Sequence, residues 1–534
     1  MTTRYTFSIV VLSASVICLG NDIDMCFPAT VHDNVLAVNG SKRENVFLNP
    51  IMGGDYPDPT IVRDGEDYYM THSAFNYVPG LTVFHSRDLV NWKPVGYALT
   101  EYLGSVWAPD ISCHDGRYYI YFTVSVGNDN FSNYVVYADR PEGPWSKPVD
   151  LHIGGWIDPC HAVDESTGER WLFMSGGHRI RLSDDGLSAA GKLEKIYDGW
   201  PIPEDWTIEG MALEGPKIKK IGEYYYFLNA EGGTAGAPTS HMAVVARSKS
   251  LDGPWENSPS NPLIHTYGRD EKWWSKGHAS LIDTPSGDLL TVYHAYEKGF
   301  LSYGRQTLME PVEITDDGWI SAPLGSGVEA PIPAPIDLRM EPDRHSRLGE
   351  FRIGLDWKFY KDYDPQRIRR EKDALLMKGK GTDPAGSSPM LFVTGDHAYE
   401  FSVKIECEGD AVGGLILYYN DRCYIAHGSN GRDRYKWRRG EFRGKCWPDA
   451  KGPLWLRLRC EDNIVSGYYS SDGKTWKKES FGMEMSGYNH NTLGDFQSVL
   501  PGLFSYGGGS VRFTDFKYSP LPGDHHAPAR QYNR

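Results

Sequence analysis

The stretch Asp55-Tyr56-Pro57-Asp58-Pro59-Thr60 places a carboxylate between two prolines, and Asp64-Gly65-Glu66-Asp67-Tyr68-Tyr69-Met70 follows shortly after it. Each proline ring fixes its own φ and biases the residue before it toward extended geometry, so Asp58 lies on stiff backbone. A turn and an aromatic strand come next. Alone, this is the pattern of an ordinary Pro-Asp turn. Its repetition along the chain predicts acids held at the starts of strands.

Four further repeats follow between residues 108 and 319. Each begins with a polar or acidic segment and continues with an aromatic strand, a second strand and, in most repeats, a closing Trp turn. Repeats of about 40–50 residues are typical of propeller blades, in which short antiparallel strands stack radially. The repeats begin at Ala108-Pro109-Asp110, Asp158-Pro159, Glu214-Gly215-Pro216 and Gly277-His278-Ala279.

These repeats predict an all-β fold, with a five-bladed β-propeller over residues 47–326. The blade starts then converge near the central axis, and the acids Asp58, Asp158 and Glu214 share one pocket although they lie far apart in the sequence. This convergence is the geometric step on which the functional prediction depends.

Composition changes after the fifth repeat. Residues 327–344 are rich in proline and predict an extended, semi-rigid linker. Alternating strand patterns, such as those at 399–405 and 454–459, predict a β-sandwich over residues 345–521. The polar residues 522–534 are expected to form a loose tail.

The N-terminus has the pattern of a secretory signal. Arg4 precedes an apolar run over residues 7–19, and Gly20 is a small residue near a cleavage point. We therefore expect a signal peptide over residues 1–20, an irregular lead-in over 21–46 and a secreted, extracellular protein. The apolar run is short for a bilayer span, so no membrane association is expected.

Four of the eight cysteines lie in the C-terminal third, so a disulfide bond between two of them is an open alternative in a secreted protein.

The charge balance narrows the choice of ligand. The 534 residues include 70 Asp and Glu against 55 Lys and Arg, which gives a net charge of −15 and argues against a nucleic-acid partner. Aromatic residues are abundant, with 33 Tyr, 16 Trp and 20 Phe. A neutral, hydroxyl-rich ligand such as a sugar suits this composition. The pattern gives no indication of the oligomeric state.

Three acids at matching positions suit the hydrolysis of a glycosidic bond. One carboxyl group protonates the leaving oxygen and another activates water or attacks directly. The acid must keep its proton near neutral pH, so its pKa must be raised by burial or by a neighbouring negative charge. Singly, Asp58, Asp158 and Glu214 are each compatible with a turn acid. As a set they favour catalysis.

The chain resembles glycoside hydrolase family 43, a family of five-bladed propellers, over residues 49 to about 326. The C-terminal part resembles the concanavalin A-like sandwich of the family's β-xylosidases, mainly through Gly413-Gly414-Leu415-Ile416-Leu417-Tyr418-Tyr419-Asn420. The matching propeller motifs, in the family's order, are Asn49-Pro50-Ile51, Tyr56-Pro57-Asp58-Pro59, Ser105-Val106-Trp107-Ala108-Pro109, Ile157-Asp158-Pro159, Glu214-Gly215-Pro216, Ala230-Glu231-Gly232-Gly233-Thr234, Gly277-His278-Ala279 and Gly304-Arg305-Gln306-Thr307.

The resemblance implies an inverting mechanism. In it Asp58 is the general base, Glu214 is the general acid, and Asp158 orients the acid and raises its pKa. An inverting pair stands about 6.5–9.5 Å apart to leave room for the attacking water.

The resemblance also implies binding residues. Phe75 and Trp107 match aromatic walls of the first sugar site, with buried blade aromatics as the alternative. Arg305 matches a pocket arginine that hydrogen-bonds sugar hydroxyls, with a structural ion pair as the alternative. His278 matches a position near the axis where some members hold a cation, with a core histidine as the alternative. No cofactor is expected to be required, and a structural calcium ion near the axis is left open.

The predicted function is an exo-acting, inverting glycoside hydrolase that releases terminal β-D-xylose from xylo-oligosaccharides or xylan. The alternatives are an α-L-arabinofuranosidase acting on arabinoxylan, a protein with both activities, or a non-catalytic carbohydrate-binding propeller. An endo-acting arabinanase fits less well, because the sandwich would wall one end of a groove. Cys160, His72 and Asn76 depart from the family pattern near the pocket and leave the sugar preference open.

Overall fold

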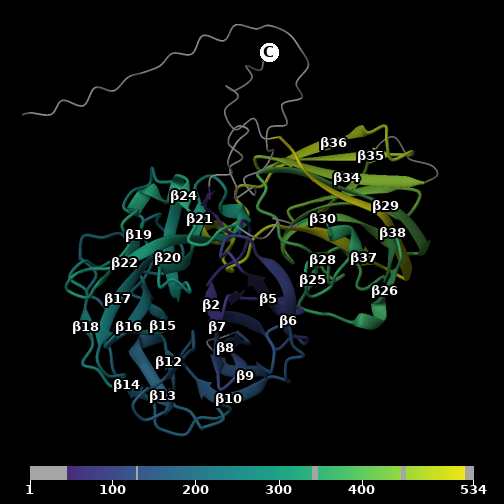
Figure 1. Ribbon diagram of the computed structural model, residues 1–534. Coiled ribbons are helices and arrows are strands. Elements are labelled where there is room, and N and C mark those ends of the chain that lie inside the picture. The colour runs from purple at the N-terminus through teal and green to yellow at the C-terminus, as the bar shows by residue number, and fades with distance from the viewer. Residues whose placement is uncertain (1–44, 128–129, 339–344, 346, 447–452, 523–534) are drawn as a thin grey trace, which may run out of the picture.

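The computed structural model describes residues 45–127, 130–338, 345, 347–446 and 453–522. It is all-β, with a five-bladed propeller followed by a two-sheet sandwich (Figure 1). The predicted signal peptide, nearly all of the lead-in and nearly all of the tail lie outside the described residues. Within these residues, no helix has the length and apolar character needed to cross a bilayer.

Each blade is an antiparallel sheet whose strands follow one another in the chain, as predicted. The first strands of successive blades contact one another around the axis. The blades are β2 (Thr60–Asp64), β3 (Asp67–Thr71), β5 (Gly80–Ser86) and β6 (Lys93–Leu99); β7 (Ser105–His114), β8 (Arg117–Ser125), β9 (Phe131–Ala138) and β10 (Val149–Gly154); β11 (Cys160–Val163), β12 (Arg170–Met174), β13 (His178–Arg181) and β14 (Glu194–Lys195); β15 (Leu213–Ile221), β16 (Tyr224–Glu231), β17 (Met242–Ser248), β18 (Glu256–Asn257) and β19 (Ile264–His265); and β20 (Trp273–Asp283), β21 (Leu289–Glu297), β22 (Arg305–Ile314) and β23 (Ile320–Ser321).

Apolar side chains hold neighbouring blades together. Five buried clusters each combine residues of two adjacent blades, including the pair formed by the fifth and first blades. Between the first two blades, for example, Leu81 and Val83 pack with Ile111 and Ile120. The alternation of each strand turns one set of aromatic and β-branched residues toward each neighbour. Burial between blades therefore forces the starts of all five blades to surround one axis.

The segment before the first blade closes the ring. Asn49 exchanges hydrogen bonds with Met309 of β22, with its Nδ2 donating to the carbonyl and its Oδ1 accepting from the amide, both at 2.9 Å. The short strand β1 (Val46–Phe47) pairs with β24 (Ile332–Pro333). Part of the proline-rich stretch thus adds a strand beside the propeller.

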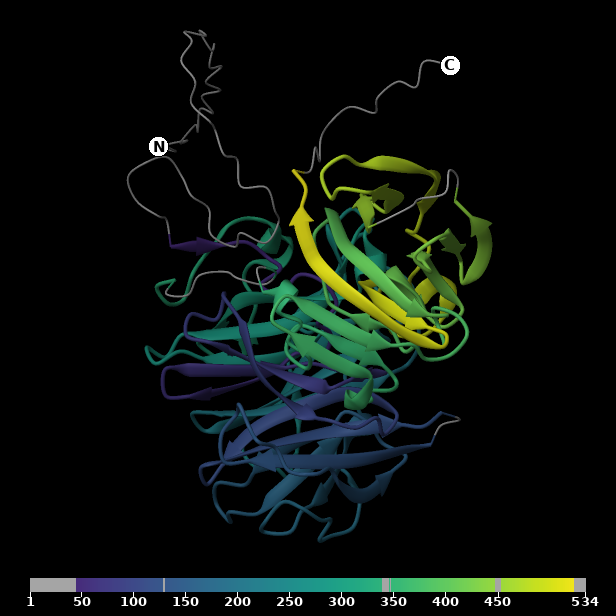
Figure 2. The same cartoon turned by 90° about the vertical axis from the view of Figure 1, so that its right-hand side faces the viewer.

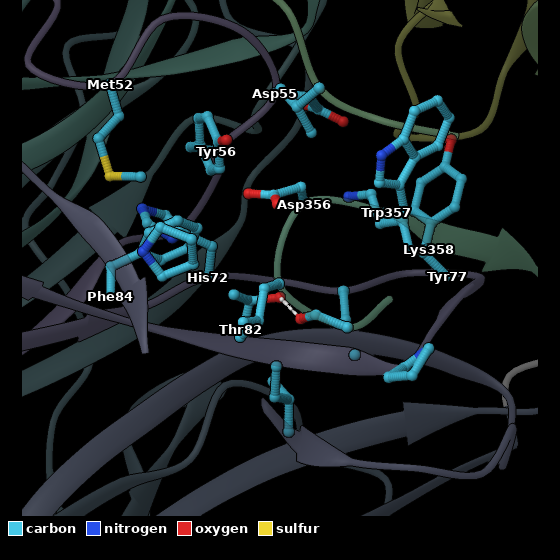
Figure 3. A pocket seen from close by; sticks show the side chains of 18 of the residues that line it. Met52, Asp55, Tyr56, His72, Tyr77, Thr82, Phe84, Asp356, Trp357 and Lys358 are labelled. Atoms are coloured by element: carbon cyan, nitrogen blue, oxygen red, sulfur yellow. Dashed lines mark hydrogen bonds between the residues drawn. The ribbon is translucent and has the colours of Figure 1, made fainter. Parts of the chain in front are cut away.

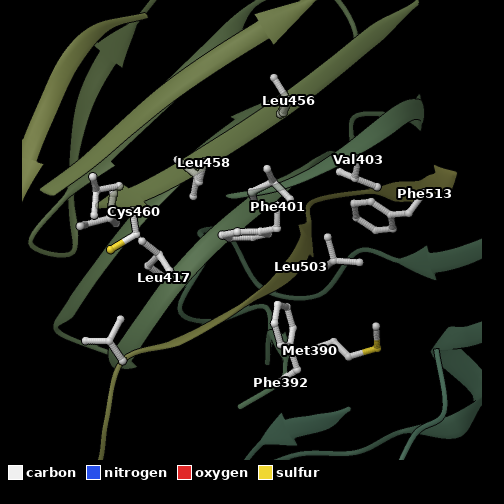
Figure 4. Packing of buried hydrophobic residues seen from close by; sticks show 14 of the residues in the cluster. Met390, Phe392, Phe401, Val403, Leu417, Leu456, Leu458, Cys460, Leu503 and Phe513 are labelled. Carbon is white, nitrogen blue, oxygen red and sulfur yellow. The ribbon is translucent and has the colours of Figure 1, made fainter. Parts of the chain in front are cut away.

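The sandwich packs an eight-stranded sheet against a seven-stranded sheet around a large apolar core, which includes Phe401, Leu417, Leu458 and Phe513 (Figure 4). Its elements are β25 (Lys358–Tyr360), β26 (Ile368–Glu371), β27 (Ala374–Lys378), β28 (Met390–Leu391), β29 (Ala398–Gly409), β30 (Val412–Asn420), β31 (Cys423–Ser429), β32 (Arg434–Arg438), β33 (Glu441–Lys445), β34 (Leu454–Glu461), β35 (Ile464–Ser470), β36 (Lys477–Glu484), helix α1 (His490–Leu493), β37 (Leu500–Tyr506) and β38 (Gly509–Pro520).

The two domains share a sheet. Strand β4 (Tyr77–Val78), which lies within the first blade's sequence, pairs with β25 and becomes an edge strand of the eight-stranded sheet. Figures 1 and 2 show the sandwich beside the propeller, with β25 near β5 and β6. This pairing fixes the sandwich next to the segment that carries Phe75. The six described cysteines form no disulfide.

Candidate active site

Four of the five blades place a left-handed residue at the same point. The φ angle is 56° at Asp58, 58° at Asp158, 56° at Gly215 and 56° at His278. Aspartate, histidine and glycine tolerate this conformation better than most residues do. In the fourth blade glycine occupies the left-handed position, so the acid Glu214 precedes it by one residue. The repeated geometry explains why three acids from three blades face one axis.

Asp58 is buried within a set of donors. Its Oδ1 accepts a hydrogen bond from Nη1 of Arg305 at 2.8 Å, and its Oδ2 accepts one from Oγ of Ser73 at 2.5 Å. The Nδ1 atoms of His294 and His278 lie 3.1 and 3.4 Å from Oδ1. Burial alone would raise the pKa of Asp58, but Arg305, ahead of the two histidines, holds this pKa well below its usual value. Asp58 is therefore a carboxylate at neutral pH.

Asp158 and Glu214 form a pair in which ionisation is disfavoured. Oδ2 of Asp158 accepts a hydrogen bond from the amide of Gly215 at 2.9 Å, which ties it to the residue after Glu214. Burial, followed by the charge of Asp58, raises the pKa of Asp158 to about 7. Burial, followed by the charges of Asp158 and Asp58, raises the pKa of Glu214 to about 8. The pair therefore holds a proton near neutral pH, with the higher pKa at Glu214.

Arg305 and Phe75 lie beside Asp58, and Trp107 lies in the strand next to Phe75. The Arg305 guanidinium carbon lies 5.5 Å from the centre of the Phe75 ring, and Phe75 forms an isolated β-bridge with Val106 beside Trp107. Arg305 forms the ion pair proposed as its alternative role, and its partner is Asp58 itself. The half-buried Trp107 donates its indole N–H to Oγ of Ser105 at 2.9 Å. The structure therefore places Arg305 and Phe75 at Asp58, while Trp107 follows Val106 in the adjoining strand and packs on Phe131.

His278 belongs to a buried group of histidines beside Asp58. Its ring centre lies 5.9 Å from that of His294, which stacks on His241 at 5.1 Å. Burial lowers the pKa of His278 to about 3, so the ring is neutral at pH 7. Its Nε2 has no hydrogen-bond partner within the described part of the chain. A free, neutral imidazole nitrogen can coordinate one cation or one water molecule.

The sandwich contributes a residue to this site that sequence reasoning missed. Phe496 follows α1, and its ring centre lies 5.4 Å from the Arg305 guanidinium, so Phe75 and Phe496 both contact this cation. Phe496 stacks on His490 at 3.9 Å, and Nε2 of His490 lies 3.7 Å from Oε1 of Glu209. No periodic pattern marks residues 490–496 in the sequence. Their position depends on the docking of the two domains.

Replacing Phe496 by alanine is expected to lower kcat/KM about 2- to 30-fold, because a cation–aromatic contact contributes roughly 0.5–2 kcal/mol. Arg305 would lose one of its two aromatic neighbours while keeping its bond to Asp58. The measurement is steady-state kinetics on a pentoside. Phe442→Ala, at a ring that is 58% exposed on the sandwich, is the matched control and should leave kcat/KM unchanged. Equal kinetics for both variants would contradict this role.

A small pocket lies between the domains, lined by residues that include Asp55, Tyr77 and Lys358 (Figure 3). The Asp55 carboxylate accepts a hydrogen bond from the amide of Arg305 at 3.2 Å and packs so closely on Gly304 that a Cβ there would lie 2.2 Å from Oδ1. Burial raises the pKa of Asp55, while burial lowers the pKa of Lys358 to about 8. Asp55, within the opening motif, thus holds the backbone that carries Arg305.

These contacts combine an ionised carboxylate, a protonated carboxyl group and a buried guanidinium at one end of a propeller axis. Asp58 can accept a proton from water, and Glu214 can donate one to a leaving oxygen. Asp158 adds negative charge beside Glu214 and bonds to its neighbour Gly215. Acid–base hydrolysis of a glycoside requires this set of groups.

Comparisons with known proteins agree with this chemistry. Glycosyl hydrolases family 43 matches residues 47–320, and the β-xylosidase C-terminal concanavalin A-like domain matches residues 352–519. The non-reducing end α-L-arabinofuranosidase BoGH43B of Bacteroides ovatus is 33% identical over 72% of this chain and 76% of its own length. A putative β-xylosidase of Escherichia coli is 26% identical over 80% of this chain and 90% of its own length.

Solved structures show the same two-domain architecture. A crystal structure of the family 43 protein BlXynB of Bacillus licheniformis, determined as a mutant, matches with a TM-score of 0.80 and 28% identity, covering 89% of this chain and 100% of that one. The predicted family and the predicted all-β fold are therefore confirmed. The chain belongs to glycosyl hydrolases family 43 and is a glycoside hydrolase with a carbohydrate substrate.

Proposed function

We propose that this protein is an exo-acting, inverting glycosidase that releases terminal β-D-xylose from xylo-oligosaccharides or xylan. Asp58 is the general base, Glu214 is the general acid, and Asp158 orients the acid and raises its pKa. The observation that carries the proposal is the opposite protonation of two carboxyl groups beside one guanidinium: Asp58 is held ionised and Glu214 is held protonated. Arg305, Phe75 and Trp107 bind the terminal sugar.

The exo mode is supported by the sandwich. Phe496 contacts Arg305, and Asn491 exchanges hydrogen bonds with Gly236 of the propeller, so α1 and the loop after it border the site on one side. A wall on one side suits a pocket that accepts a chain end better than a groove open at both ends. Xylose is favoured because the second domain matches the C-terminal domain of β-xylosidases.

An α-L-arabinofuranosidase is the second candidate, favoured by the 33% identity to BoGH43B. Incubation with aryl β-D-xylopyranoside and aryl α-L-arabinofuranoside separates the two. We expect a higher kcat/KM on the xyloside, while a higher value on the arabinofuranoside would establish the second candidate. If neither is cleaved and bound xylo-oligosaccharides remain intact over a long incubation, the protein is a carbohydrate-binding propeller and the proposal fails.

The pH profile follows from the two pKa shifts. As pH rises, Glu214 loses its proton and kcat/KM falls with an apparent pKa near 8. As pH falls, Asp58 becomes protonated only well below its usual pKa, so the acid limb of the pH profile lies at low pH.

Asp158→Asn removes one of the negative charges that raise the pKa of Glu214, so the alkaline limb of the pH profile should move to lower pH. Asp139→Asn, at an exposed acid, is the control. An unmoved limb in Asp158→Asn would contradict the assigned role.

We also propose that the reaction requires no cofactor, because carboxyl groups and water supply all the proton transfers. A structural cation such as Ca²⁺, where one binds, would take at most one ligand from Nε2 of His278 and its other ligands from water, because Ca²⁺ prefers oxygen ligands. Dialysis against EDTA is therefore expected to leave kcat unchanged, and added Ca²⁺ to raise Tm. A loss of kcat that Ca²⁺ restores would contradict the first of these proposals.

Secretion is a further proposal, supported by the apolar run at residues 7–19. Sequencing the N-terminus of the protein recovered from the culture medium tests it. The expected mature chain begins close to residue 21.

A further inference from the structure

A basic cleft opens at one edge of the sandwich. It lies between the β32–β33 hairpin and β36 and has a volume of about 600 Å³. Its lining belongs wholly to the sandwich and shares no residue with the candidate active site. Its apolar lining includes Ile425, Phe481 and Met483. Its cations include Lys436, Arg438 and Arg439.

The register of the strands explains how this mixture arises. Arg438 pairs with Ile425 and Lys436 pairs with His427, so these cations share the face of β31 and β32 that carries Ile425. Trp437 lies on the other face, in a separate apolar cluster. The cations therefore border the apolar lining.

The cleft carries uncompensated positive charge. Within the described residues, Lys436, Arg438 and Arg439 form no ion pair, and the acids closest in these strands are already engaged. Glu441 pairs with Arg443, and Glu479 pairs with the buried Arg434 at 2.5 Å. The cleft thus collects positive charge in a chain whose net charge is −15. The mutual repulsion of these cations favours a bound anion.

The hairpin turn strengthens this inference. Arg439 and Gly440 form its two-residue loop with φ angles of 53° and 72°, the geometry of a type I′ turn. Asparagine, aspartate or glycine is favoured at the first position, and arginine is strained there. Strain of this kind is often retained where the side chain has a function. Here the strained residue adds a guanidinium to the lining of the cleft.

An aromatic ring adds to this surface, because the half-buried Phe481 lines the cleft. Aromatic rings stack on the apolar faces of sugars, while guanidinium groups bind carboxylates through paired hydrogen bonds. A nucleic acid would bring a dense row of charges toward an acidic protein, whereas an acidic polysaccharide carries few charges between neutral sugars.

We propose that this cleft is a second carbohydrate site, which binds a polysaccharide bearing uronic-acid carboxylates. Arg438 and Arg439 hold the carboxylate, and Phe481 contacts a sugar ring. The site is separate from the catalytic pocket and tethers the enzyme to acidic regions of its polymer. It depends on the carbohydrate substrate of the family and not on which pentose is released.

The test measures binding of full-length Asp58→Asn protein to glucuronoxylan and to the same polymer after its carboxyl groups are reduced to alcohols. We expect at least tenfold tighter binding to the acidic polymer at low salt, and a loss of this preference at high salt. The double variant Arg438→Gln/Arg439→Asn should lose the preference, and asparagine suits the turn geometry, so the fold is retained. The control Arg369→Gln/Arg370→Gln removes two exposed cations of β26 and should keep it.

Equal affinity for the two polymers, or an unchanged preference in the cleft variant, would overturn the proposal. Competition by single-stranded DNA as strong as that by glucuronoxylan would also overturn it, because the cleft would then bind polyanions in general. Turnover of an aryl pentoside is measured separately in the wild-type background and should not change with the cleft variant. Failure of the proposed catalytic function would appear only in that second assay.

Discussion

Asp58→Asn is expected to lower kcat on a pentoside about 10²- to 10⁴-fold, the usual contribution of a general base. Asparagine tolerates the left-handed backbone at φ 56°, its Oδ1 can accept the hydrogen bond from Arg305, and its Nδ2 can donate to the hydroxyl of Ser73. It cannot take a proton from water. The substitution therefore removes the chemistry and keeps the geometry, which alanine at this φ would strain.

Steady-state kinetics with a matched measurement of Tm tests this expectation. Asp67→Asn is a suitable control, because Asp67 lies in the same blade and is half-exposed, away from the axis. It should retain its kcat. A kcat above a tenth of the wild-type value in a folded Asp58→Asn protein would contradict the assignment of Asp58 as base.

Glu214→Gln is expected to lower kcat about 10²- to 10⁴-fold on xylobiose, in which the leaving sugar must be protonated. The loss should be far smaller on a 2,4-dinitrophenyl glycoside, since its leaving group departs without a proton. The alkaline limb of the pH profile should disappear in the variant, because the group with a pKa of about 8 is absent.

The exposed Glu223, at the turn between β15 and β16, provides the matched substitution Glu223→Gln. This control should behave as the wild type on both substrates. If Glu214→Gln reduced turnover of both substrates equally, Glu214 would act by binding or orienting the sugar rather than by donating a proton.

The sequence allowed prediction of the parts of the site that repeat. Asp58 and Asp158 stand at equivalent points of two blades, Glu214 directly precedes that point in a third, and the periodic aromatic strands locate those points without any structure. The left-handed backbone that these points share follows from residue types that tolerate it. Proline-flanked acids and a regular repeat were therefore sufficient to predict the ring and its acids.

Other contributors could not be predicted because they depend on long-range docking. Phe496 reaches Arg305 only because β4 joins the sandwich sheet and α1 contacts the propeller. Two-residue pairing between β4 and β25 gives almost no sequence signal. Asp55 lay within the opening motif, but its bond to the amide of Arg305 links residues at opposite ends of the propeller sequence.

Arg305 illustrates another limit of prediction from the sequence. The two roles considered for it, sugar contact and structural ion pair, are not exclusive, because its ion-pair partner is Asp58. The guanidinium both holds the pKa of Asp58 low and lies between the rings of Phe75 and Phe496. A sequence pattern identifies residues singly, whereas the function of this arginine lies in its combined contacts with Asp58, Phe75 and Phe496.

The central claim is that acids from three blades surround one sugar, and a crystal structure of the Glu214→Gln variant with bound xylobiose tests it most directly. We predict the terminal xylose beside Arg305, with the introduced amide side chain at the glycosidic oxygen and Asp58 on the opposite face of the ring, about 6.5–9.5 Å away across a water molecule. Xylobiose bound elsewhere, or with Asp58 and the side chain at position 214 on the same face of the sugar, would contradict the account.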